Sequence, residues 1–307
     1  MTIELTDLIE SPVDASEIDE LGHLSVPFYE RRAVAACHEL AQQHGLDIAG
    51  YRNHGVEFTL VDAYLRNLRE QFLGAPLLVR GGVLSASSER LQCYQELVNM
   101  QTGDLSATFV YAFELQRYTT RAPVPFPAEL VKSASASIVA WPQHGRPRSI
   151  DLGHMPARPE LETLVHLDLA LSQPRHIEAD ECDETGTYLA ERFLHLPYSG
   201  ERVDDPAALW VFETSEGHTL GMADLESRQL LCGLPRIGER IQSFRAEIEI
   251  ASKTFYRNHW VYSLDSGRLI SIAALVSVAL DLDARRAVAI PPDMRQALQR
   301  RLHPELR

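Results

Sequence analysis

The 307-residue chain is predicted to fold as two α+β units, each combining one central helix with antiparallel strands. Its length suits two domains of about 150 residues, each able to bury its own core. A short motif occurs twice, once near the N-terminus and once past the middle. After each copy come runs rich in Val, Leu, Tyr and Phe that turn residues separate, the pattern of antiparallel strands.

The repeated motif places a carboxylate three residues before a glycine. The first copy has Asp19 and Gly22, and the second has Asp183 and Gly186. Each copy follows an extended segment and precedes a helical start. The glycine lets the backbone turn, and a new helix offers unpaired N–H groups with partial positive charge near the carboxylate. A base or nucleophile beside an anion-stabilising pocket is the minimum set of groups for acyl transfer.

The two copies keep a nearly constant offset along the chain. Asp183 minus Asp19 gives 164, and Arg286 minus Arg121 gives 165. Matching offsets at both ends of a segment indicate an internal duplication. We therefore expect a first domain over residues 1–133, a linker over 134–173 that is rich in Pro, and a second domain over 174–307.

In the first half, residues 1–10 are expected to form an N-terminal arm. Apolar residues at helical spacing from Tyr29 onward predict the central helix, which Gly45 would end. Ser25 and Pro27 suit the start of that helix. The ranges predicted to form an antiparallel meander are 56–66, 77–84, 89–101 and 107–117.

The second half is expected to retrace this order with changes. Pro197 interrupts the helical segment after the second motif, and a helix is expected to restart at residues 205–210. The strands predicted for this half are 176–179, 241–251, 254–263 and 269–282.

Charge and cysteine usage exclude several classes of function. A net charge of -14 argues against nucleic acid or an anionic membrane as a partner. No apolar run approaches a membrane span, and the N-terminus is acidic where a secretory signal is basic, so we expect a cytoplasmic protein. The cysteines are far apart, which predicts reduced thiols with no metal site and no cofactor. They are Cys37, Cys93, Cys182 and Cys232.

The string Asp-x-x-Gly-His followed by an aromatic residue resembles the hotdog-fold acyl-CoA thioesterases of the 4-hydroxybenzoyl-CoA thioesterase type. This resemblance implies that each unit is an antiparallel sheet wrapped around a central helix, and that the chain is a tandem, double hotdog. It also implies that the motif aspartate serves as nucleophile or general base. Backbone N–H groups at the start of the central helix would then polarise the thioester carbonyl.

The resemblance assigns candidate roles residue by residue. The catalytic candidates are Asp19, Asp183 and His23. The candidates for the oxyanion and substrate contacts are Leu24, Ser25, Phe28 and Tyr29. The candidates for binding the phosphates of coenzyme A are Arg121, Arg285 and Arg286. The second copy has Thr187 in place of the histidine, so we expect the first site to be the more active.

Each candidate also has an ordinary structural interpretation. The aspartates could be turn or capping carboxylates, which are common. Tyr29 at helical spacing suits a core residue, and loop arginines are usually solvated. These interpretations stay open on sequence grounds.

The activity that the resemblance implies is hydrolysis of an acyl-CoA thioester to a free carboxylic acid and coenzyme A. Coenzyme A would then be part of the substrate, with an acyl carrier protein thioester as the less favoured variant. A homodimer of such chains is a further expectation. A hotdog-fold hydratase or dehydratase is less favoured, because its Gly-Asp-x-Asn-Pro-x-His string is absent. A non-catalytic acyl-CoA-binding module would be favoured if both aspartates were buried in capping bonds.

Overall fold

The computed structural model describes residues 4–19, 21–198, 211–213, 217 and 219–307. The chain divides into two compact units, Met1–Arg146 (unit 1) and Pro147–Arg307 (unit 2). Part of the segment expected as a linker contributes to a core, because Leu164 and Leu169 are buried in a hydrophobic cluster of unit 2.

Unit 1 contains one antiparallel sheet with the strand order β1-β3-β4-β5-β2. Two expectations were wrong. The first residues are not a free arm, because β1 pairs with β3 along one edge of the sheet. The sheet is also not a simple meander, because β2 pairs with β5 at the other edge and not with β3. The strands are β1 (Thr6–Pro12), β2 (Val56–Asn67), β3 (Pro76–Ala86), β4 (Leu91–Asn99) and β5 (Leu105–Arg117), with the short β6 (Pro123–Val124) beside β5.

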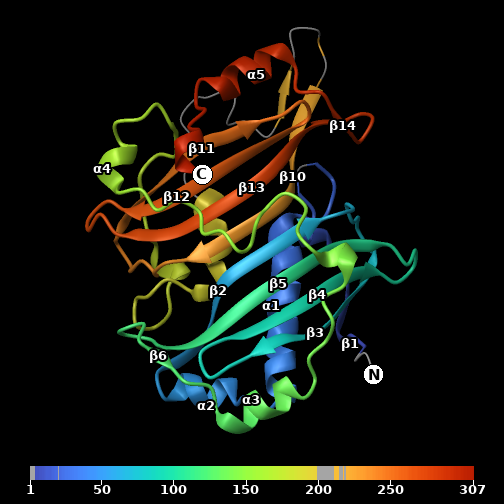
Figure 1. Cartoon of the computed structure of the whole chain (residues 1–307), viewed down its shortest axis with the longest axis vertical. Helices are drawn as coiled ribbons and strands as arrows, with labels where there is room; N and C mark the ends of the chain where they lie inside the picture. The colour runs from blue at the N-terminus through green and yellow to red at the C-terminus, as the bar shows by residue number, and fades with distance from the viewer. Residues whose placement is uncertain (1–3, 20, 199–210, 214–216, 218) are drawn as a thin grey trace. The chain divides into compact units, whose positions relative to one another are not determined.

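The predicted central helix of unit 1 is confirmed as α1 (Val26–Gln43), which lies against the sheet (Figure 1). Ser25 is its N-cap residue, and Gly45 follows its C-terminal end with a φ of 92°. Its buried face includes Tyr29, Ala33, Ala36, Cys37, Leu40 and Ala41. Their spacing of three to four residues sets one stripe of the helix on the sheet. The shorter helices are α2 (Ile48–Asn53) and α3 (Ala128–Ser135).

Unit 2 also contains an antiparallel sheet, with the order β10-β13-β12-β11-β7. The strands are β7 (Ala170–Leu171), β10 (Thr219–Leu231), β11 (Arg240–Ile250), β12 (Thr254–Ser263) and β13 (Leu269–Asp281). Short β8 (Arg175–His176), β9 (Val211–Glu213) and β14 (Arg286–Val288) extend the edges, and the helices are α4 (Leu161–Leu164) and α5 (Pro292–Gln299). The strand predicted at 176–179 is therefore shorter than expected, because a 3₁₀ turn, Ala179–Glu181, begins where it was to continue.

After the second motif the chain forms a 3₁₀ helix, Ala190–Tyr198, that contains Pro197. A proline removes one backbone donor, which is consistent with an interrupted helix here. The helix predicted at 205–210 lies outside the described residues.

The two units repeat the same backbone geometry at an offset of 164 residues. Gly74 and Gly238 have φ values of 78° and 76°, and Gly103 and Gly267 have 75° and 69°. The positive-φ residues Arg121 (57°) and Arg285 (48°) also correspond. The offset between the two halves of the sequence had matched Arg121 with Arg286, and this match was wrong by one residue.

The sheet face that α1 covers in unit 1 differs in chemistry from the same face of unit 2. In unit 1 this face includes Leu60, Val83 and Cys93, all buried. The positions 164 residues later are Asp224, Glu247 and Arg257. Arg257 is 1% exposed and donates to Asp224 over 2.8 Å. Unit 2 therefore has buried ion pairs where unit 1 has apolar packing.

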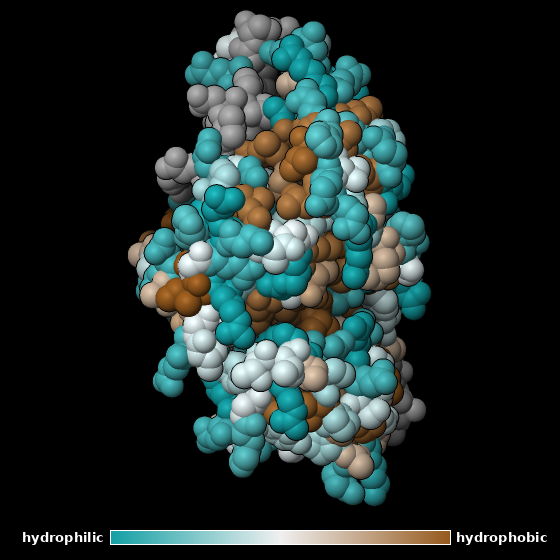
Figure 2. All heavy atoms as spheres, turned by 90° about the vertical axis from the view of Figure 1, so that its left-hand side faces the viewer, coloured by the Kyte–Doolittle hydropathy of each residue, from teal (hydrophilic) through white to brown (hydrophobic). Residues whose placement is uncertain are grey.

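On the surface, polar residues cover most of the face shown in Figure 2, and hydrophobic residues emerge between them in patches. No helix in the described part of the chain is long and apolar enough to span a membrane.

Candidate active site

Asp19 opens a tight turn that ends at the start of α1. Its Oδ1 atom accepts from the backbone N–H groups of Leu21 (2.9 Å) and His23 (3.4 Å). The turn closes through Asp19 N–H to His23 O (2.9 Å) and Gly22 N–H to Asp19 O (3.0 Å). Gly22 has a φ of 81°, which glycine adopts without strain. One carboxylate oxygen of Asp19 therefore stabilises the turn, as its ordinary structural interpretation requires.

The second oxygen of Asp19 faces a histidine. His23 Nδ1 lies 3.1 Å from Asp19 Oδ2 and 3.3 Å from the carbonyl oxygen of Leu24. Both neighbours are acceptors, so a proton on Nδ1 satisfies them, and in that tautomer Nε2 is the basic nitrogen. The structure thus brings two of the predicted catalytic residues together as a carboxylate–imidazole pair.

Glu70 completes a row of three titratable side chains. Its Oε1 atom lies 3.7 Å from His23 Nε2, on the side of the ring opposite Asp19. The side chains of Asp19, His23 and Glu70 are 28%, 16% and 33% exposed, so the row is open to water. A water that contacts both Nε2 and Glu70 Oε1 from the side would be within reach of a base and an orienting acceptor.

Sequence reasoning missed Glu70. It lies in the loop between β2 and β3, 51 positions after Asp19, and no local pattern marks it. Backbone bonds bring it to the site. Leu24 N–H donates to Gln71 O over 2.7 Å, and the Tyr29 hydroxyl donates to Arg69 O over 3.2 Å.

Three of the expected oxyanion donors already have partners. Leu24 N–H donates to Gln71 O (2.7 Å), Ser25 N–H to Glu17 O (2.9 Å) and Phe28 N–H to Ser25 O (3.0 Å). Tyr29 is 4% exposed, and burial raises the pKa of its hydroxyl far above the usual range, as for a core residue.

The helix start still offers one N–H group. Pro27 has no N–H, and Val26 N–H has no partner among the described residues. Val26 is 40% exposed and is the first residue of α1. Its N–H group therefore lies at the positive end of the helix dipole, in a residue that is exposed to solvent.

The ion pair between Glu17 and Arg32 attaches the segment before the turn to α1. Glu17 Oε2 accepts from Arg32 over 2.6 Å and from Asp14 N–H over 3.0 Å. Burial would raise the pKa of Glu17, but the hydrogen bonds from Arg32 and Asp14 and the charge of Arg32 hold it below its usual value. Arg32 also donates to the carbonyl oxygens of Phe28 and Pro12. The guanidinium therefore joins β1, the turn and the helix.

The second motif repeats the turn without its histidine. Asp183 Oδ1 accepts from the N–H groups of Thr185 (2.8 Å) and Thr187 (3.1 Å) and from the Thr185 hydroxyl (2.7 Å). Leu234, which is 7% exposed, occupies the position that corresponds to Glu70. Asp183 is thus a turn-stabilising carboxylate with hydroxyl neighbours and no imidazole.

The arginines expected to bind phosphate lie away from the turn of their own unit. Arg121 follows the end of β5 and pairs with Glu57 over 3.1 Å. Ser106, which holds the Glu70 loop, lies 11 residues before that end, about 36 Å along a strand.

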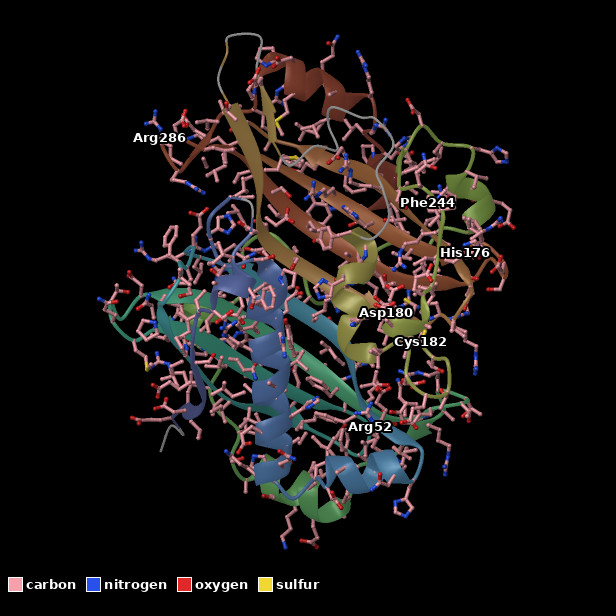
Figure 3. The ribbon with its side chains drawn as sticks, turned by 180° about the vertical axis from the view of Figure 1, so that it is seen from behind. Arg52, His176, Asp180, Cys182, Phe244 and Arg286 are labelled. Carbon is pink, nitrogen blue, oxygen red and sulfur yellow. The ribbon has the colours of Figure 1, made fainter. Side chains whose placement is uncertain are left out.

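Unit 2 shows the same separation. Arg285 and Arg286 are exposed in the β13–β14 hairpin. Figure 3 shows Arg286 at the other end of the unit from Asp180 and Cys182, which lie beside the second motif. No described contact brings the predicted phosphate-binding arginines to the turn of the unit that carries them.

Comparison with known proteins adds to this geometry. Residues 13–133, which lie in unit 1, match the family model described as Thioesterase-like superfamily. No curated protein sequence matches the chain.

Several solved structures share the fold over both units. A putative oleoyl thioesterase from Lactobacillus plantarum is 13% identical, with 91% of this chain and 97% of that chain covered and a TM-score of 0.66. The 12:0-ACP thioesterase from Umbellularia californica is 9% identical, with 88% and 93% covered and a TM-score of 0.67. An acyl-ACP thioesterase from Bacteroides thetaiotaomicron is 11% identical, with 88% and 96% covered and a TM-score of 0.59. The chain therefore has the expected α+β fold built from hotdog units.

Proposed function

We propose that this protein hydrolyses acyl-CoA thioesters at the Asp19 turn of unit 1, as a tandem hotdog enzyme of the 4-hydroxybenzoyl-CoA thioesterase type. The observation that carries the proposal is the row Asp19–His23–Glu70 together with the start of α1 three residues after His23, where Val26 N–H has no described partner. The match of this unit to the Thioesterase-like superfamily supports it. Fold alone does not assign a reaction, so the argument rests on these side chains.

The geometry favours an orienting role over a nucleophilic one for the Asp19 side chain, with His23 as the base. The Oδ1 atom of Asp19 already accepts two backbone N–H groups, and Oδ2 lies 3.1 Å from His23 Nδ1. Asp19 then holds the imidazole in the tautomer whose Nε2 atom takes a proton from water. Glu70 accepts the second hydrogen of the same water and so orients it.

The reaction follows from these positions. The thioester carbonyl oxygen accepts from Val26 N–H, where negative charge develops as water attacks the carbonyl carbon. The water proton passes to His23 Nε2, the carbon–sulfur bond breaks, and the proton leaves with the thiolate of coenzyme A. The products are a carboxylic acid and the free thiol.

An acyl carrier protein thioester is the alternative substrate in this proposal. The structures from Umbellularia and Bacteroides are titled as acyl-ACP thioesterases. Both alternatives place the same carbonyl and the same sulfur at the site, so the test should include both.

The test compares Asp19→Asn with the matched Asp183→Asn on a panel of acyl-CoA and acyl-ACP thioesters, by release of free thiol. Without Asp19 to hold the imidazole of His23, general-base catalysis is lost, and that loss typically costs at least about a hundredfold in rate. We expect that loss for Asp19→Asn and a change of less than about threefold for Asp183→Asn. Equal losses, or an Asp19→Asn enzyme near wild-type rate, would reject the assignment.

A further inference from the structure

The loop that carries Glu70 also presents hydrophobic side chains to solvent. In this Glu70 loop, residues 67–75, Leu68 is 38% exposed, Phe72 is 54% exposed and Leu73 is 64% exposed. Val26, whose N–H group is the candidate oxyanion donor, is 40% exposed. The bond between Leu24 N–H and Gln71 O ties this loop to the start of α1. The exposed side chains and the candidate catalytic row therefore belong to one connected piece of structure.

Backbone bonds hold the Glu70 loop in place. The N–H groups of Leu68 and Arg69 donate to Ser106 O over 2.9 and 3.1 Å, and Gly74 N–H donates to Val13 O over 3.0 Å. Gln71 is 4% exposed and accepts from Asn99 over 2.8 Å. A loop fixed in this way presents its exposed side chains without an ordering cost, which favours binding.

Unit 2 shows that the loop geometry does not require these side chains. There Cys232 N–H and Gly233 N–H both donate to Ile270 O, and Gly238 N–H donates to Ile177 O, as in unit 1. At the positions of Phe72 and Leu73, however, unit 2 has Arg236 and Ile237.

The two turns also pack differently on their loops. A Cβ atom added at Gly186 would lie 2.9 Å from Cγ2 of Ile237, so Ile237 packs on the turn of unit 2. A Cβ atom added at Gly22 would have nothing within 4 Å. Leu73 has no such contact with Gly22, and it is 64% exposed, against 52% for Ile237.

We propose that Val26, Phe72 and Leu73 bind the acyl group of the substrate, which makes the site selective for uncharged, apolar acyl groups longer than acetyl. This inference rests on the proposed function. The acyl group begins at the carbonyl carbon, between Val26 N–H and His23, and so leaves the site beside the Glu70 loop. Apolar surface suits a hydrocarbon or aromatic acyl group, and neighbouring Asp19 and Glu70 would repel an acyl group that ends in a carboxylate.

The test measures binding without turnover. Ethyl and dodecyl thioethers of coenzyme A lack a scissile thioester, and calorimetry gives their affinities for the wild type and for the double variant Phe72→Ser/Leu73→Ser. Burial of two such side chains corresponds to at least about a tenfold gain in affinity. We expect the wild type to prefer the dodecyl thioether, and the double variant to lose about tenfold of that preference. Val165→Ser, at a position that is 54% exposed in unit 2, is the matched control and should keep the preference.

Each outcome decides the matter. An unchanged preference in the double variant, or an equal loss in Val165→Ser, overturns the inference. A double variant that keeps the preference but loses self-association in sedimentation shows a contact between copies of the chain and also overturns it. If the wild type hydrolyses no thioester yet the double variant loses the dodecyl preference, the proposed reaction fails and the acyl site stands. Both side chains are more than half exposed, so the melting temperature should stay unchanged.

Discussion

At the scale of single residues, the two motifs differ in side chains and not in backbone. Asp19 N–H donates to His23 O and Asp183 N–H to Thr187 O, both over 2.9 Å. Leu24 N–H and Tyr188 N–H likewise donate to Gln71 O and Pro235 O. Since both turns hold their aspartate alike, the chemistry of the first must come from His23 and Glu70, which the second lacks.

The substitution His23→Thr copies the second motif into the first. It keeps the turn, because Thr187 occupies the same position in unit 2, but removes the only imidazole of the row. We expect kcat to fall by about a hundredfold or more, with an unchanged melting temperature. Thr187→Ala in unit 2 is the control and should leave kcat unchanged. A His23→Thr enzyme within about threefold of wild type would show that His23 takes no part in proton transfer.

Glu70→Gln tests the residue that the sequence did not reveal. The amide still accepts a hydrogen bond from water but has no charge beside His23 Nε2, so we expect a smaller loss than for His23→Thr, of about tenfold in kcat. The pH profile of kcat should also shift, because the charge that faces the imidazole is gone. A buried structural role would instead lower the melting temperature and leave the pH profile in place.

Sequence alone could identify Asp19 and His23 because they share one turn with Gly22. Glu70 was not predictable, since 47 positions separate it from His23 and the contact arises only when the loop bonds to the start of α1. The donor at Val26 likewise emerged only after the structure showed that the neighbouring N–H groups have partners.

At the scale of elements, the strands that sequence predicted well are rich in aromatic and β-branched residues. The strand expected at 254–263 is β12 with the same bounds. No strand was expected for β10, whose centre reads Asp-Leu-Glu-Ser-Arg-Gln although Glu226, Arg228 and Gln229 are buried. β1 was also missed because it is a charged edge strand, and its pairing with β3 is a long-range contact. In β10, the buried polar residues thus interrupt the apolar pattern by which a strand is recognised in sequence.

Removing one partner of the buried ion pair Asp224–Arg257 should lower the free energy of unfolding more than replacing both partners with apolar residues. Asp224→Leu leaves Arg257 buried without its 2.8 Å partner, so we expect a loss of about 3–5 kcal/mol in the free energy of unfolding. The double variant Asp224→Leu/Arg257→Cys carries the residues that unit 1 has at these positions and should recover part of that loss. Denaturant unfolding of the wild type, both single variants and the double variant measures the coupling. If the losses in the two single variants add up to the loss in the double variant, Asp224 and Arg257 do not interact directly.

The pair Glu17–Arg32 predicts how acid weakens the attachment of the turn to α1. Because the folded pKa of Glu17 lies below its usual 4.5, the charged form contributes stability above that value and loses it as pH falls through the folded pKa. Glu17→Gln should therefore lower the melting temperature at pH 7, and the difference from wild type should shrink at pH values below about 4.5. A difference that stays constant from pH 7 to pH 3 would exclude an ionic contribution.

At the scale of the whole molecule, the described residues hold one complete candidate site, as we expect if the two units arose by duplication and then diverged. Unit 1 has the row Asp19–His23–Glu70, whereas unit 2 has Thr187 and Leu234 at the last two positions. A fused pair of units no longer needs one sequence to serve two sites, so one copy can keep the chemistry while the other changes. The buried charges of unit 2 are a second mark of this divergence.

This divergence predicts the binding stoichiometry. Titration of the full chain with the dodecyl thioether of coenzyme A should give one site per chain, because among the described residues only unit 1 combines a helix-start N–H group that lacks a partner with the exposed Phe72 and Leu73 in the loop at its turn. Phe72→Ser/Leu73→Ser should weaken that single site, whereas Ile237→Ser, at the position in unit 2 that corresponds to Leu73, should change neither affinity nor number. Two equivalent sites per chain would show that the turn of unit 2 also binds substrate, and the loss of His23 and Glu70 from that turn would then affect the rate of hydrolysis and not recognition.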